Sequence, residues 1–247
     1  MSILRLDKYL ADAGIGTRSE IKKYIRQGFV CVNCTKATNP DIKINPKTDQ
    51  VSFKKQLIQL AEFEYYILNK PSGYVSATKD NASPTVLSLI KSNRKDLFPV
   101  GRLDKDTEGL LLITNDGALS HRLLSPKHHV NKTYYAVVEG EVTSNDICAF
   151  EQGLIIGAED LPAAMPAKLT IIEPYNAQAN LSYVHVTIQE GKFHQVKRMF
   201  QAVGKKVVYL KRIQMGSLIL PPDLSPGDYR PLTEEEHKTL LKCISHS

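Results

Sequence analysis

The chain has 247 residues, 42% of them hydrophobic and 23% charged, and a formal net charge of +6. This is ordinary globular usage, sufficient for a buried core and for a small domain beside a medium one. No apolar run approaches the roughly 18 residues of a membrane span, and the N-terminus shows no signal-peptide pattern. We therefore exclude a membrane protein and expect a soluble, cytoplasmic one.

The positive charge is distributed unevenly along the chain. Residues 1–60 contain 11 basic and 5 acidic residues, whereas residues 61–247 contain 21 of each. Within this neutral part, residues 192–212 contain seven basic residues and no acidic one. Two separate basic zones in one chain indicate a polyanionic partner that contacts both.

Two short helices are predicted at the start of the chain. Leu6, Tyr9 and Leu10 have helical spacing, and Gly14 supplies a left-handed stop. The second helix is predicted to begin at Thr17, which forms a capping box with the glutamate three residues later. One side of it carries a row of cations about 6 Å apart, a spacing suited to nucleic-acid phosphates. These candidate RNA-binding residues are Arg18, Lys22, Lys23 and Arg26.

Strand material follows these helices, from residue 29 to Val51, with a turn at Asn33 and Cys34. Two helices and a small sheet in about 50 residues resemble the S4-type RNA-binding domain, although that family often has Gly where Cys34 stands. Cys31 and Cys34 have no second pair of ligands nearby, so we expect free thiols and no metal. We predict an S4-like domain over residues 1–51 and a linker over residues 52–61.

Residues 62–247 are predicted to form one α+β domain with a mixed or antiparallel sheet. Strands are expected at residues 63–68, 110–113, 132–140, 168–172, 181–188 and 207–220. Helices are expected at residues 85–90, 118–124, 196–203 and 233–241.

The segment from Pro99 to Gly117 places a charged loop directly before a buried strand. Five ionisable residues fall within seven positions, and glycines flank them. Such loops on a rigid scaffold commonly present reactive side chains, although a solvated hairpin loop would have the same composition. The five residues are Arg102, Asp104, Lys105, Asp106 and Glu108.

Three sequence blocks stand in a distinctive order in this domain: residues 69–73 (NKPSG), residues 101–107 (GRLDKDT) and residues 190–199 (EGKFHQVKRM). With residues 231–235 (PLTEE) near the end, nearly the whole chain resembles the ribosomal small subunit family of pseudouridine synthases, bacterial enzymes that act on 16S rRNA. The resemblance implies an S4-like domain followed by a pseudouridine synthase catalytic domain.

The resemblance also implies the site. Asp104 corresponds to the essential aspartate of the family, Tyr134 to the tyrosine that stacks on the target base, and Lys197 to the cation that pairs with the aspartate. Arg198 stays open as the alternative partner. Neither a cofactor nor a metal is implied. The further residues expected to bind substrate or RNA in this domain are Arg102, Lys192, His194, Gln195 and Arg198.

These residue types suit the conversion of uridine to pseudouridine. The N1–C1′ bond breaks, the uracil turns, and C5 joins C1′ through an electron-poor sugar centre that a carboxylate can stabilise. An adjacent cation favours the ionised carboxylate. Attack of Asp104 on C1′ and removal of the 2′ proton to give a glycal both stay open. For Asp106 and Glu108 we expect only a role in balancing the loop charges of Arg102 and Lys105.

The expected target is uridine 516 of 16S rRNA, in free rRNA or in a small-subunit assembly intermediate, with the enzyme as a monomer. A large-subunit rRNA synthase is one alternative, disfavoured by Phe193, His194 and Gln195 where such relatives tend to have Asn-Arg-Gln. A non-catalytic rRNA-binding assembly factor is another. A metal-dependent phosphoesterase using Asp104 and Asp106 would need a third ligand cluster.

Overall fold

The computed structural model describes the chain except for residues 1–2, 47, 59–62, 93, 158–162 and 244–247. It divides into two units, residues 1–62 and residues 63–247. None of the helices in the described ranges has both the length and the hydropathy to cross a membrane.

The first unit contains the two predicted helices, α1 (Leu6–Asp12) and α2 (Arg18–Arg26). Thr17 and Glu20 form the capping box that starts α2. The apolar faces of both helices pack together in one core that includes Leu10 and Ile21. Strand β1 (Leu4–Arg5), which precedes α1, pairs with β4 (Lys43–Ile44). The prediction of two short helices is confirmed.

A four-stranded antiparallel sheet completes this unit, in the order β3 (Thr35–Lys36), β2 (Val30–Val32), β5 (Val51–Phe53) and β6 (Gln56–Ile58). The turn between β2 and β3 has positive φ angles at both Asn33 (49°) and Cys34 (66°). A type I′ turn requires this geometry, which favours glycine at the second position. Cys34 therefore occupies a strained position.

The predicted linker over residues 52–61 is wrong as far as residue 58. Ser52 and Phe53 belong to β5, which pairs with both β2 and β6. Strands β5 and β6 form a hairpin, whose turn is made by Lys54 and Lys55 with positive φ angles. Residues 59–61 lie outside the described residues.

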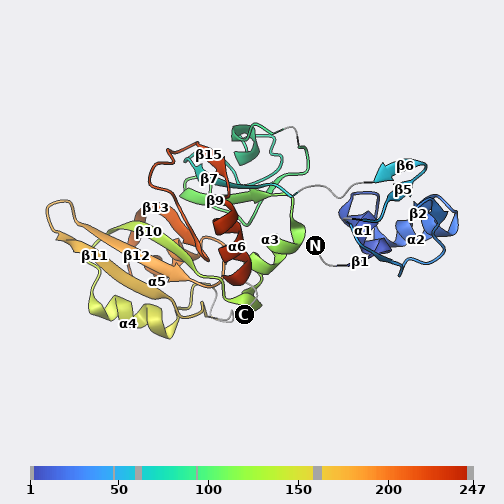
Figure 1. The fold of residues 1–247 in the computed structure, drawn as a ribbon. Coiled ribbons are helices and arrows are strands. Elements are labelled where there is room, and N and C mark those ends of the chain that lie inside the picture. The colour runs from blue at the N-terminus through green and yellow to red at the C-terminus, as the bar shows by residue number, and fades with distance from the viewer. Residues whose placement is uncertain (1–2, 47, 59–62, 93, 158–162, 244–247) are drawn as a thin grey trace. The chain divides into compact units, whose positions relative to one another are not determined.

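The second unit is built on a nine-stranded mixed sheet (Figure 1). Its strands lie in the order β11 (Lys168–Asn176), β12 (Leu181–Ile188), β10 (Lys132–Glu139), β13 (Lys206–Met215), β9 (Glu108–Thr114), β7 (Tyr65–Lys70) and β15 (Tyr229–Pro231). Two short strands pair outside this path: β14 (Leu218–Ile219) with β13 and β8 (Phe98–Pro99) with β9.

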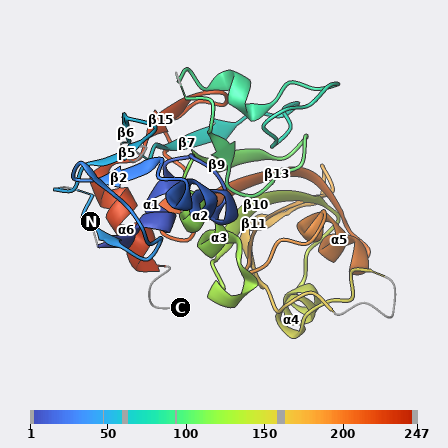
Figure 2. The same cartoon turned by 90° about the vertical axis from the view of Figure 1, so that its right-hand side faces the viewer.

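Helices cover the two halves of this sheet separately (Figures 1 and 2). α4 (Ser144–Gln152) and α5 (Gln195–Ala202) pack into the larger core, whereas α3 (Gly117–Leu124) and α6 (Glu234–Cys243) pack into the smaller one. Two segments are 3₁₀ helices, η1 (Val86–Leu89), where we had expected a helix over residues 85–90, and η2 (Pro126–His128). α4 was not predicted, although Thr143 and Asp146 form a capping box at its start.

A parallel pairing between β9 and β13 joins the two halves of the sheet. Arg212 pairs with Gly109 in β9 and with Tyr134 in β10. A side chain at Gly109 would lie 2.2 Å from the carbonyl oxygen of Arg212, so only glycine permits this approach. The junction places the charged loop that precedes β9 next to Tyr134, although these residues lie far apart in the sequence.

Candidate active site

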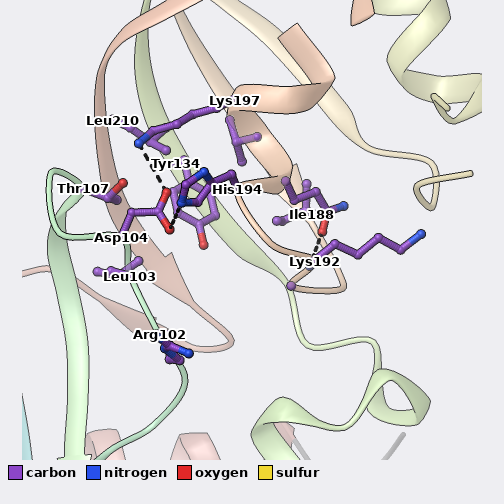
Figure 3. Close-up of a pocket in the computed structure, with 13 residues that line it drawn as sticks. Arg102, Leu103, Asp104, Thr107, Tyr134, Ile188, Lys192, His194, Lys197 and Leu210 are labelled. Atoms are coloured by element: carbon purple, nitrogen blue, oxygen red, sulfur yellow. Dashed lines mark hydrogen bonds and ion pairs between the residues drawn. The ribbon is translucent and has the colours of Figure 1, made fainter. Parts of the chain in front are cut away.

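A pocket of about 420 Å³, counting the solvent at its open mouth, lies beside this junction. Three parts of the chain line it: the loop before β9, the strands β10, β12 and β13, and the segment that leads into and begins α5. Asp104 lies between Lys197 and His194, with the ring of Tyr134 behind it (Figure 3). The remaining lining residues are Arg102, Leu103, Thr107, Ile188, Gly191, Lys192, Gln195, Val196 and Leu210.

The carboxylate of Asp104 faces two nitrogen-bearing side chains. Lys197 Nζ lies 3.3 Å from Oδ2, and His194 Nε2 lies 3.5 Å from Oδ1. The Asp104 side chain is 26% exposed, so it can be reached from the pocket while the protein holds it on both sides. Of the two basic residues considered as its partner, Lys197 makes the contact, whereas Arg198 Nη1 donates to the carbonyl oxygen of Phe193.

Asp106 also binds Lys197. The ammonium of Lys197 donates to both carboxylate oxygens of Asp106, at 2.7 and 2.9 Å. This hydrogen bond lowers the pKa of Asp106. Desolvation alone would lower the pKa of Lys197, but the bonds and charges of Asp106 and Asp104 together raise it. The expectation that Asp106 balances Arg102 and Lys105 is wrong, since the structure pairs it with the cation beside Asp104.

Lys70 binds the backbone of the loop that carries Asp104. The sequence analysis did not identify it as a site residue. Its side chain is fully buried, and Nζ donates to the carbonyl oxygens of Pro71 (3.1 Å), Lys105 (3.1 Å) and Thr107 (2.7 Å). Burial lowers the pKa of Lys70 to about 8. The sequence block over residues 69–73 did point to this region. The sequence alone does not tell which of its side chains is buried, because that depends on how strand β7 packs in the sheet. Lys70 therefore fixes the backbone on both sides of Asp106.

Thr107 is a second site residue that the sequence analysis did not identify. It lines the pocket and is 2% exposed, and its backbone N–H donates to the carbonyl oxygen of Asp104 at 3.1 Å. Its hydroxyl has no hydrogen-bond partner among the described residues. The buried hydroxyl is thus an unsatisfied polar group at the wall of the pocket.

Gln195 lines the pocket, but the polar atoms of its side chain bind other parts of the protein. It is 4% exposed, its Oε1 accepts from the backbone N–H of Lys192 (2.9 Å), and its Nε2 donates to Glu190 (2.9 Å). We had expected Gln195 to bind RNA, but its polar atoms hold the segment that carries His194. His194 has a left-handed φ of 49°, a strained conformation that this bracing stabilises.

Tyr134 and Tyr135 lie on opposite faces of β10, as the strand period requires. Tyr134 is 8% exposed and lines the pocket. Tyr135 packs edge-on against His185 and Tyr209 of the neighbouring strands, so its predicted cross-strand role is confirmed.

The other predicted binding residues are placed differently from one another. Arg102 is exposed where it lines the pocket, whereas Lys192 Nζ donates to the carbonyl oxygen of Ala163 at 2.8 Å. Glu108, expected to balance loop charge, belongs to β9 and accepts a 2.7 Å hydrogen bond from Tyr209 Oη. The four cations of α2 are all exposed in the first unit. In the described part of the chain, no three His, Cys, Asp or Glu side chains gather where a metal ion could bind.

Two family descriptions match the sequence. The RNA pseudouridylate synthase family matches residues 64–202, which include Asp104, Tyr134 and Lys197, and the S4 domain matches residues 4–51. These two matches place the protein among the isomerases that make pseudouridine in RNA, with an S4 domain before the catalytic domain.

Full-length relatives define the family more closely. The chain is 46% identical to an uncharacterized RNA pseudouridine synthase, YtzG, of Bacillus subtilis, which covers 94% of this chain and 96% of the relative. It is 42% identical to ribosomal small subunit pseudouridine synthase A of Escherichia coli K12, covering 94% and 98% respectively. A solved pseudouridylate synthase matches 96% of this chain and 99% of its own, with a TM-score of 0.68 and 39% identity. The chain belongs to the ribosomal small subunit pseudouridine synthase A family.

Proposed function

We propose that this enzyme converts one uridine of 16S rRNA to pseudouridine, and that the target is uridine 516. The relatives named for the small ribosomal subunit support this substrate. The observation that carries the proposal is the accessible Asp104 carboxylate, 3.3 Å from Lys197 in a pocket backed by Tyr134.

In this proposal Tyr134, Asp104 and Lys197 have separate roles. The target nucleotide leaves its stack, and the ring of Tyr134 receives the uracil, which offsets about 1 to 3 kcal/mol of the unstacking cost. Asp104 acts at the sugar while the N1–C1′ bond breaks, the base turns and C5 joins C1′. The proton on C5 is lost and N1 gains one, so that the product is an isomer of the substrate.

Lys197 holds the Asp104 carboxylate in position through the 3.3 Å contact of its Nζ. Its own ammonium is stabilised by Asp106, whose two oxygens it contacts. Asp104 acts either by bonding to C1′ or by removing the 2′ proton. Substrate deuterated at C2′ distinguishes the two, because only the second route gives a primary isotope effect on product formation.

The S4-like unit supplies affinity in this proposal. Its row of exposed cations on α2 contacts phosphates of structured rRNA, either free or in a small-subunit assembly intermediate. We propose that the enzyme acts as a monomer in the cytoplasm, where such RNA is assembled.

The test is to incubate the protein with free 16S rRNA and with small-subunit assembly intermediates, and to map pseudouridine by carbodiimide treatment and primer extension. We expect one modification at uridine 516 and none with Asp104→Asn. Modification of large-subunit rRNA instead would favour the large-subunit alternative. Binding of 16S rRNA without any product would favour the non-catalytic assembly factor.

A further inference from the structure

Phe193 is an exposed aromatic residue at the edge of the pocket. Its side chain is 74% exposed, and it belongs to none of the hydrophobic clusters of the described residues. It is flanked in sequence by Lys192 and His194, both of which line the pocket. An aromatic ring this exposed contributes little to the core.

The ring of Phe193 nevertheless has a partner within the protein. It stacks on the ring of His194 with centroids 3.8 Å apart and an angle of 19° between the planes. Its carbonyl oxygen accepts a 3.2 Å hydrogen bond from Arg198 Nη1. One face of the Phe193 ring is therefore covered by His194 and the other is open. The guanidinium group of Arg198 is hydrogen-bonded to the backbone of Phe193.

The pair lies close to the reacting centre. Two contacts of less than 4 Å each, Phe193 to His194 and His194 to the Asp104 carboxylate, connect the open ring with the candidate catalytic acid. Bases in a nucleic-acid strand follow one another at a rise of about 3.4 Å in a duplex. A nucleotide next to one whose base has entered the pocket is therefore within reach of Phe193.

We propose that the open face of Phe193 stacks on the base of the nucleotide adjacent to the target uridine, replacing the stacking partner which that base loses when the uridine turns out. This inference rests on the proposed function for the position of the RNA. A flat aromatic ring beside cations suits a nucleobase, and stacking of this kind contributes about 1 to 3 kcal/mol for each base without regard to its identity. Phe193 would hold the gap in the RNA open.

The test uses a 16S rRNA fragment around uridine 516, with the fluorescent base 2-aminopurine placed on the 5′ or the 3′ side of the target. Binding is followed in the Asp104→Asn background, so the readout does not need turnover. We expect quenching at one of the two positions, its retention in Phe193→Tyr, and its loss in Phe193→Ala and Phe193→Leu. Phe63→Ala removes another exposed aromatic side chain of the same unit and serves as the control.

Turnover gives a second readout. Phe193→Ala should lower kcat/KM about 5- to 150-fold on intact RNA, which corresponds to the loss of one stacked base. On RNA with an abasic site at the contacted position, the kcat/KM of the wild-type enzyme should fall by a similar factor. Phe193→Ala should cause no further loss on that RNA. Equal quenching with and without Phe193→Ala in the Asp104→Asn background would overturn the inference. So would a loss of kcat/KM in Phe193→Ala that is as large on abasic RNA as on intact RNA. Quenching that depends on Phe193, together with no pseudouridine product from the enzyme that retains Asp104, would support the stacking site and refute the proposed function.

Discussion

Helix α2 and the pocket of the second unit both gather positive charge, but they use it differently. Arg18, Lys22, Lys23 and Arg26 are all exposed and make no ion pair with any residue that the structure describes. At the pocket, Lys197 contacts two carboxylates, and Lys70, buried next to the loop that lines it, donates to three carbonyl groups. Exposed cations can exchange water for phosphate and are screened by salt, whereas paired and buried cations fix the loop that carries Asp104. RNA affinity and turnover should therefore respond to different substitutions.

Among the cations, Lys197 should give the largest effect on turnover. Replacing Lys197 with methionine removes the charge beside Asp104, and we expect kcat to fall roughly 10²- to 10³-fold, by analogy with the loss of one electrostatic donor from an active site. Lys197→Arg keeps the charge with a different shape and should retain more activity. Single-turnover rates at saturating RNA measure the effect. A Lys197→Met rate within threefold of wild type would contradict this assignment.

The buried cation should affect stability as well as turnover. Lys70→Met leaves three carbonyl groups without their donor, and we expect the free energy of unfolding to fall by about 2 to 4 kcal/mol, measured by urea denaturation. The loss should depend on pH. The folded protein releases the Lys70 proton near pH 8, whereas the unfolded chain retains it until about pH 10.5.

Because the unfolded state binds more protons in this window, the stability contributed by Lys70 rises as the pH increases from 8 to 10.5. The difference in unfolding free energy between wild type and Lys70→Met should therefore grow over that range. A difference that shrinks with rising pH would mean that the buried amine is not the group that titrates.

The exposed cations should change affinity and leave turnover intact. Lys22→Glu combined with Arg26→Glu removes two phosphate contacts, so the slope of log affinity against log salt should become shallower by about two units. The rate at saturating RNA should match wild type. Lys238→Glu, a charge reversal at an exposed position of helix α6, is the control and should leave the slope unchanged. An unaltered slope in the double variant would mean that α2 does not contact the RNA.

The smallest effect is expected for the acid that begins strand β9. Glu108→Gln weakens the hydrogen bond from Tyr209, which should reduce stability by about 1 kcal/mol and change turnover less than twofold. Thermal denaturation and the pseudouridine assay report the two quantities. A tenfold loss of turnover would show that this acid is coupled to the pocket.

Local patterns in the sequence predicted much of the fold. The capping box at Thr17, the alternation along β12 and the apolar face of α5 specify their elements within a few residues. Contacts between distant segments were not predictable in this way. The parallel pairing at Gly109 and the hairpin ending in β6 depend on partners far along the chain or on turn geometry.

The site was predicted in part for the same reason. The charged loop and the basic segment before α5 were identified from composition, but adjacent residues on a helix point in different directions. Only the position of α5 against the loop determines that Lys197, and not Arg198, contacts Asp104. The inward positions of Lys70 and Gln195 likewise depend on the packing of the sheet.

The separation of turnover from RNA affinity can be measured directly by comparing Asp104→Asn with the α2 double variant on one 16S rRNA fragment. Asp104→Asn should bind the RNA as tightly as wild type and form at least about a thousand times less pseudouridine at saturation. The α2 variant should bind weakly and react at the wild-type rate once saturated. Pseudouridine formed by Asp104→Asn at a rate near that of wild type would contradict the account.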